Sequence, residues 1–275
     1  GTGDRVTARG GVEAILVPRE GSALTSPARA EGDRLESRRD EDGKSGRLVL
    51  SGSPARLDIP PDVGTGGRRA VANEFEATLV GGQLSRVTVP GPLVFSESAA
   101  LAREGATSTP AARRLESGNG QLTFAADGRT IDAAVLDGGV KLSEGTRLSV
   151  RAPHASLRGT DETAVFAGSA ETPARYEDEK TRVSATVLTW FRRDDRIEGV
   201  GSVKTTFRGR EGSDVLGGSP DAPVFSESDF LRVTPSERKV LLTGNVTAWQ
   251  EENVLRAQSI LLDDRERVLR AEGGV

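Results

Sequence analysis

The stretch KVLLTGNVTAWQEENVLRAQSILLDDRERVLRAEGGV (residues 239–275) decides the fold, because its pattern predicts two strands, a turn and the start of a third strand. In this stretch a small residue, Ala257, is followed by Gly273 at an interval of 16 residues. The same interval separates Ala152 from Gly168, Ala185 from Gly201, Ser228 from Gly244 and, with a weaker anchor, Thr123 from Gly139. A constant spacing of this kind indicates a repeated structural unit.

The residues between these anchors repeat as well. Apolar residues stand three and five positions after the small residue, as in Ile260 and Leu262 after Ala257. A polar cluster follows, such as PSER at 235–238, and an apolar run then leads into the glycine. Alternating apolar positions interrupted by a turn at intervals of about 10–14 residues predict antiparallel strands joined by hairpins.

The glycine of each unit predicts a bend or bulge in its strand. The three-residue step from Ala257 to Ile260 breaks the alternation and predicts a matching kink on the neighbouring strand. Kinks at equivalent heights would fold a sheet along a crease. The sequence therefore predicts an all-β fold, a creased antiparallel sheet built from repeated hairpins.

The first half carries the same pattern less regularly. VFSES occurs at 94–98 and again at 224–228. We expect two sets of repeats, 1–112 and 113–275, whose sheet is continuous. Residues 18–46 are rich in Arg, Glu, Ser and Gly and predict a flexible polar insert. Shorter polar inserts are expected at 60–69, 100–112 and 210–222, and the Ala-rich stretch 99–113 is compatible with a brief helix.

Composition and motifs argue against several function classes. The net charge is −4 without a basic stripe, so no nucleic-acid partner is expected, and there is no cysteine. His154 lacks a nucleophile motif, and the acidic pairs at 194–195 and 263–264 fall at equivalent turns, where Asp is favoured for local hydrogen bonds. We expect a protein that is not an enzyme, with no catalytic residue, no metal and no cofactor.

The segments at 182–207 (RVSATVLTWFRRDDRIEGVGSVKTTF) and 224–275 resemble the OstA-like family, the LptA–LptC bridge proteins of bacterial lipopolysaccharide transport. The resemblance implies a β-taco or β-jellyroll whose open V receives acyl chains, and modules that stack edge to edge. It implies lipopolysaccharide or another envelope lipid as cargo. It also implies that the partners are other bridge modules or further copies of this chain, joined by strand edges. The implied location is the periplasm, with any membrane anchor in a segment outside this chain.

The start and the end of the sequence share the phrase Gly-Gly-Val, at 10–12 and 273–275. We therefore expect the chain to be a piece of a longer array with unpaired strand edges at both ends.

A groove that holds a lipid must not fill itself, and a chain with only 4% aromatic residues suits that need. Each buried methylene of an acyl chain gains about 0.8 kcal/mol. Trp190 is expected inside the groove, whereas Trp249 fits either face. The residues expected to line the groove are Val183, Ala185, Leu188, Trp190, Ile197, Val203, Phe230, Val233, Val240, Leu242, Val246, Ala248, Leu255, Ala257, Ile260 and Leu262.

Two other classes stay open at this point. One is a structural β-repeat or stalk with a closed interior that its own side chains fill. The other is a carbohydrate-binding protein of the cell envelope or a carbohydrate-active enzyme on a repetitive β scaffold, and the enzyme would need an exposed acidic or aromatic platform.

Overall fold

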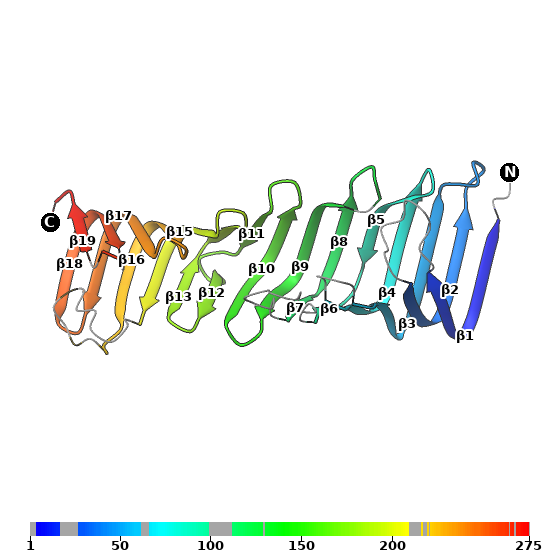
Figure 1. Cartoon of the computed structure of the whole chain (residues 1–275), viewed down its shortest axis with the longest axis horizontal. Helices are drawn as coiled ribbons and strands as arrows, with labels where there is room; N and C mark the ends of the chain where they lie inside the picture. Colours follow the sequence, from blue (N-terminus) through cyan, green and yellow to red (C-terminus); the bar gives the residue numbers. More distant parts are fainter. Residues whose placement is uncertain are drawn as a thin grey trace, which may run out of the picture. The chain divides into compact units, whose positions relative to one another are not determined.

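The computed structural model describes residues 4–16, 27–61, 66–98, 112–128, 130–208, 216, 219, 221–263, 265–266 and 268–274. These residues form an all-β structure in two compact units, Gly1–Thr146 and Arg147–Val275. The described strand pairs within each unit are antiparallel (Figure 1). The predicted fold class is confirmed.

The described residues of the first unit form nine strands, which pair mainly with their neighbours in sequence. They are β1 (Arg5–Leu16), β2 (Ala28–Arg39), β3 (Gly46–Ile59), β4 (Arg68–Val80), β5 (Gln83–Val89), β6 (Leu93–Glu97), β7 (Arg113–Ser117), β8 (Asn119–Phe124) and β9 (Ile131–Glu144). Beyond β4 the ladder splits in two: β5 and β8 continue one half of it, and β6 and β7 continue the other.

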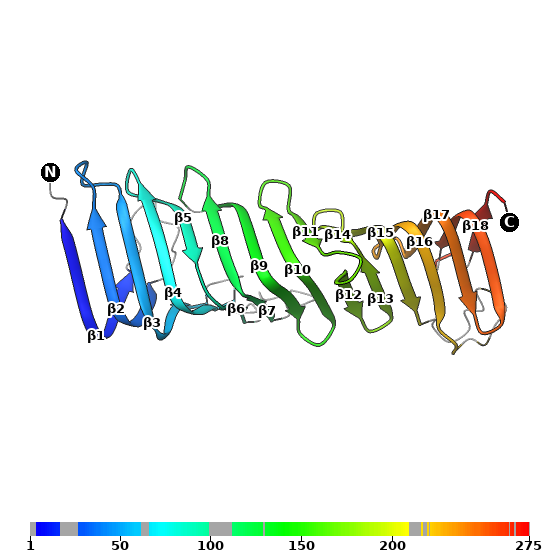
Figure 2. The ribbon, with the colours of Figure 1, turned by 180° about the vertical axis from the view of Figure 1, so that it is seen from behind.

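In the second unit, ten strands with the same organisation can be described. They are β10 (Leu148–Arg158), β11 (Thr163–Ala167), β12 (Ala174–Asp178), β13 (Thr181–Ala185), β14 (Val187–Phe191), β15 (Arg196–Phe207), β16 (Val224–Thr234), β17 (Lys239–Gln250), β18 (Asn253–Asp263) and β19 (Val268–Glu272). One end of β10 pairs with β11 and the other with β12, and these short strands lead through β14 and β13 to the two ends of β15 (Figure 2).

The crease is made by pairs of consecutive residues with positive φ. Gly201 and Ser202 have φ of 80° and 49°, and together they oppose the single residue Asp229. Gly244 and Asn245 repeat this geometry on β17, with φ of 78° and 47°. Two residues facing one is a β-bulge, which bends the strand and re-aims the side chains beyond it. The predicted bends at these glycines are confirmed.

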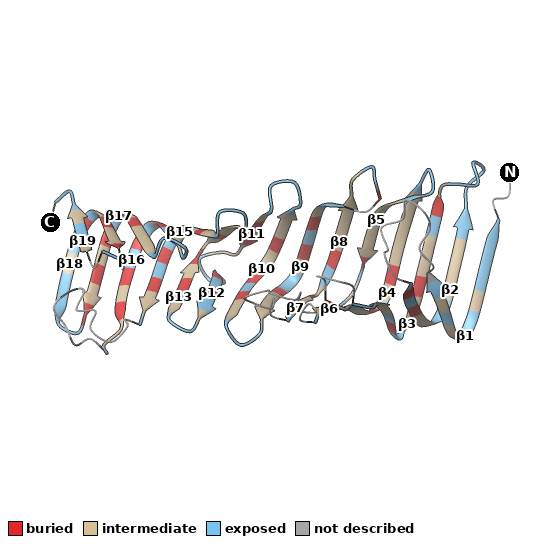
Figure 3. Ribbon diagram, viewed as in Figure 1, coloured by how far each residue is buried: buried red, intermediate tan, exposed pale blue. Residues whose placement is uncertain are grey.

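Because of the bulge, inward-facing positions on the neighbouring strand are three residues apart at the crease. Ala257 and Ile260 are both buried, and so are Ala185 and Leu188. Along β15, β16 and β17, buried residues alternate with exposed or half-buried ones (Figure 3). The core of the second unit therefore lies on the concave side of the crease.

Part of the predicted polar insert at 18–46 is wrong, because residues 28–39 form strand β2. Ala28 and Ala30 are its buried residues, while Arg29 pairs with Glu13 and Glu31 on the exposed face. A strand that buries only small residues and carries charges outside lacks the apolar alternation from which strands are recognised. Residues 18–26 of the insert lie outside the described residues.

The predicted division at 112/113 falls inside the first unit. There β6 pairs with β7, and β5 pairs with β8, so hydrogen-bonded ladders join the residues on the two sides of that point. The compatible helix at 99–113 and the insert at 100–112 lie almost wholly outside the described residues, as does most of 210–222.

Candidate functional site: an apolar groove in the second unit

The crease divides the second unit into two walls. One wall, called here the aliphatic wall, consists of β11, β14, β19 and residues 154–158, 196–200, 230–234, 239–243 and 259–263. The other, called the small-residue wall, consists of β12, β13 and residues 148–152, 203–207, 224–228, 246–250 and 253–257.

Cross-strand pairing aligns the inward residues of the aliphatic wall in two rows, because residues directly opposite in a ladder share a face. The crease row, nearer the bulges, is Ala155, Phe166, Leu188, Gly199, Leu231, Leu242, Ile260 and Ala271. The rim row, farther from them, is Leu157, Ala164, Trp190, Ile197, Val233, Val240, Leu262 and Leu269.

The two rows differ in exposure. The crease row is buried except at Ala271, with Leu231 at 0% and Leu242 at 1% of full exposure. Most of the rim row is only half-buried, including Trp190, Val240 and Leu262. An apolar surface that is closed at the crease and partly open at its rim has the form of a groove.

The small-residue wall presents shorter side chains to the same interior. Ala185, Val203, Val246 and Ala257 are buried next to the crease. Its polar members form hydrogen bonds with each other or with nearby groups, which lowers the free-energy cost of burying them. The hydroxyls of Thr205 and Ser226 are paired, and the Tyr176 hydroxyl donates to Asp178 Oδ2 at 2.8 Å. Burial and this carboxylate raise the pKa of Tyr176.

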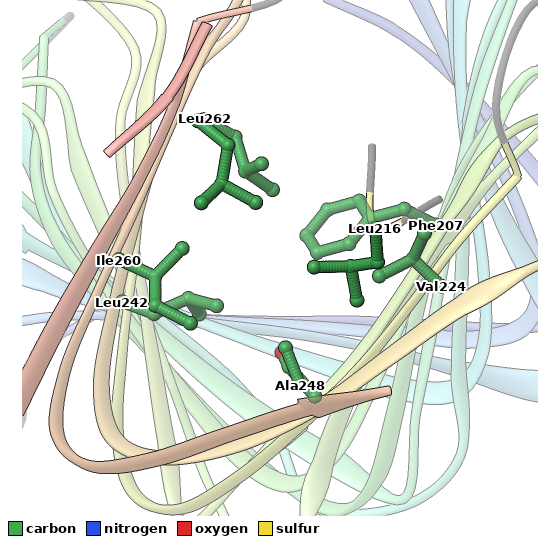
Figure 4. A pocket seen from close by; sticks show the side chains of 9 residues that line it. Phe207, Leu216, Val224, Leu242, Ala248, Ile260 and Leu262 are labelled. Carbon is green, nitrogen blue, oxygen red and sulfur yellow. The ribbon is translucent and has the colours of Figure 1, made fainter. Parts of the chain in front are cut away.

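Two small crevices lie between the walls, and each has a volume of about 10 Å³. One is lined by Phe207, Leu216, Val224, Ser226, Leu242, Ala248, Ile260, Leu262 and Leu269. The other is lined by Val150, Phe166, Tyr176, Leu188, Thr189, Trp190 and Ile197. Figure 4 shows side chains of both walls pointing into the first crevice, with Leu242, Ile260 and Leu262 facing Phe207, Leu216 and Val224. About one water molecule fills such a volume, so a larger guest requires side chains or walls to move.

Fifteen of the sixteen residues expected in the groove face the interior, and their role as lipid contacts stays a prediction. Phe230 is the exception. It pairs with Val200, which is 52% exposed, and Arg232 lies over its ring, so Phe230 lies on the outer face. The bulge shifts the inward phase from Ser228 to Leu231, which leaves Phe230 pointing away.

The two tryptophans lie on opposite faces. Trp190 is in the rim row and lines the second crevice. Trp249 stands between the buried residues Ala248 and Gln250, so it points outward, where its ring stacks on Phe225 with 5.6 Å between centroids.

Several lining residues were not expected from the sequence. Val150, Phe207, Val224 and Leu269 lie on strands whose alternation could have identified them. Leu216 lies in a polar insert and carried no such signal.

The acidic turn that begins at Asp263 is stabilised by hydrogen bonds from its own backbone. Asp263 Oδ1 accepts hydrogen bonds from the backbone amides of Arg265 and Glu266, each at 3.0 Å. Among the described residues, no group of three or more His, Asp and Glu side chains is arranged to hold a metal ion. No helix in the same part of the chain has the length and apolar character needed to span a membrane.

Comparison with known proteins gives a likeness among solved structures only. No protein-family model and no curated protein matches the sequence. Among solved structures, the chain is similar to LptH from Pseudomonas aeruginosa, described as the LptA-homologous periplasmic component of the lipopolysaccharide transport device. The sequence identity is 15% and the TM-score 0.39, over 46% of this chain and 82% of LptH. At this level the likeness does not identify the function of the chain.

Proposed function

We propose that the chain is a non-enzymatic lipid-binding conduit of the bacterial envelope, which holds acyl chains against the aliphatic wall. The observation that supports this most is the half-exposed rim row above a buried crease row. The row runs across eight of the described strands, and its leucine, valine and tryptophan side chains leave part of their surface to solvent, whereas Ala164 and Ile197 are buried.

An acyl chain suits this surface because it needs no specific polar partner. Each methylene transferred from water to the rim row gains up to about 0.8 kcal/mol. The short side chains of the small-residue wall, such as Ala248 and Ser226, leave room for a guest once the walls separate. A lipopolysaccharide-type lipid is the proposed cargo, and the proposed location is the periplasm.

Unpaired strand edges support a role as one module among several. In the described structure, β1 pairs only with β2, and residues 253–257 of β18 pair only with β17. An edge with free backbone amides and carbonyls accepts another strand. We propose that other bridge modules, or further copies of this chain, add their strands there.

Site-specific photo-crosslinking tests the conduit. A photoreactive residue at Leu262 or Leu269, in the rim row, should capture lipopolysaccharide added to the purified protein. The matched control positions are Arg256 and Arg270, which are exposed on the same strands, β18 and β19. Lipid adducts at the two leucines alone are expected, whereas equal labelling at all four positions would falsify the groove.

A closed structural module is the second candidate, and the small crevices favour it. Volumes of about 10 Å³ describe an interior that its own side chains nearly fill. This candidate predicts no lipid adduct at any of the four positions.

A further inference from the structure

The last residue of β17, Gln250, occupies an unusual place for an amide. It is 1% exposed and faces the interior of the groove. In the corresponding position on β15, six residues after the bulge glycine, stands the apolar Phe207. Burying an amide costs free energy unless hydrogen bonds satisfy it. The hydrogen-bond partners of Gln250 therefore explain why an amide can stand where β15 has a phenylalanine.

The partners of Gln250 are all backbone groups of the connection between β15 and β16. Its Nε2 donates to the carbonyl oxygens of Ser219 and Ala222, at 2.9 and 3.0 Å. Its Oε1 accepts from the Leu216 amide at 3.3 Å. Both N–H donors and the oxygen of the amide are thereby used, and one side chain fixes three points of the connection.

The fixed connection places the Leu216 side chain inside the groove. Leu216 lines the first crevice beside Phe207 and Val224 and faces Leu262 of the opposite wall (Figure 4). A leucine from outside both walls thus occupies apolar space between them.

We propose that Leu216 is a built-in occupant of the groove, held there by Gln250, which an acyl chain must displace in order to bind. This inference rests on the proposed lipid-binding function. It identifies the Leu216 side chain as the group that lowers the affinity of the groove for an acyl chain at this end of the second unit. A chain of several methylenes buries more apolar surface than one leucine side chain, so displacement is favourable for an acyl chain but not for a small apolar molecule.

Binding of cis-parinaric acid, a fluorescent fatty acid, to the purified full chain tests the role of Leu216. Leu216→Ala removes the occupant and should tighten binding by roughly three- to tenfold, the effect of a partly buried leucine. Gln250→Leu keeps an apolar interior but releases the connection, and it should tighten binding as well. The matched control is Leu241→Ala, a leucine truncation on the outer face of β17, which should leave the affinity unchanged.

Hydrogen exchange provides a second readout that does not depend on a variant. If the fatty acid displaces Leu216, the Leu216 amide loses its bond to Gln250 and should exchange faster when the fatty acid is present. Slower or unchanged exchange there would contradict the displacement.

The outcomes separate the two proposals. Binding by the unaltered protein with no gain in Leu216→Ala overturns the role of Leu216 and leaves the conduit standing. Absence of binding by the unaltered protein and by every variant overturns both.

Discussion

The two walls of the second unit share the long strands β10, β15, β16, β17 and β18, yet their inner faces differ. The aliphatic wall presents Leu188, Leu231, Leu242 and Ile260 in its crease row. The small-residue wall is largely Ala, Val, Ser and Thr. One wall therefore supplies most of the apolar area, and the other supplies the space that long side chains would otherwise take.

The largest effect that tests this difference is expected at the crease row. Leu242→Ala should lower the free energy of unfolding by about 2–5 kcal/mol, because it leaves a cavity in a fully buried position. Urea denaturation measures the change. Leu241→Ala, at the next position on the outer face, should cost less than half as much. Equal costs at the two positions would contradict the assignment of inner and outer faces.

A smaller effect is expected from the hydroxyl pair of the small-residue wall. Ser226→Ala leaves the buried Thr205 hydroxyl without its partner and should destabilise the protein by about 1–3 kcal/mol. The double variant Thr205→Val/Ser226→Ala removes both hydroxyls and should be more stable than Ser226→Ala alone. A double-mutant cycle from urea denaturation checks this, and purely additive costs would show that the hydroxyls are not coupled.

The smallest effect on stability is expected at the bulge of the crease, where the two walls meet. Gly201→Ala places a Cβ at φ of 80° and 2.9 Å from Thr186 Oγ1, which should cost about 1–2 kcal/mol in unfolding free energy. Ser202→Gly serves as its control, since Ser202 already has a positive φ of 49° and glycine adopts it without strain. If the thermal unfolding temperature falls as much in Ser202→Gly as in Gly201→Ala, the positive φ angles assigned to the bulge are wrong.

The sequence predicted the crease because its cause is local. Glycine at a fixed interval and a three-residue step between apolar positions follow directly from a bulge, as Gly244 and the pair Ala257 and Ile260 show. Strand β2 was missed because its buried residues are alanines and its charges form ion pairs outside. Apolar alternation carries no information where the buried side chain is small.

The residues of the groove also divide into those that the local pattern predicts and those that it does not. Residues on repeated strands, such as Leu188 and Leu262, could be placed from the alternation, and Phe230 was misplaced by one residue at a bulge. Leu216 could not be predicted, because its position depends on a hydrogen bond to Gln250, which lies 34 residues away in sequence. No periodic pattern reports a contact of that kind.

The bulge pairs on β15 and β17, Gly201 with Ser202 and Gly244 with Asn245, also affect how the chain can change in length during evolution. Each bulge pair opposes a single residue of the adjacent strand. A repeat of two strands therefore contains its own bend and sets the pairing register of its own strands. Gain or loss of a whole repeat would preserve every inward-facing row, whereas insertion of one residue within a strand would turn its apolar side chains to the opposite face. Duplication and deletion of complete repeats are therefore the changes in length that selection can accept most readily.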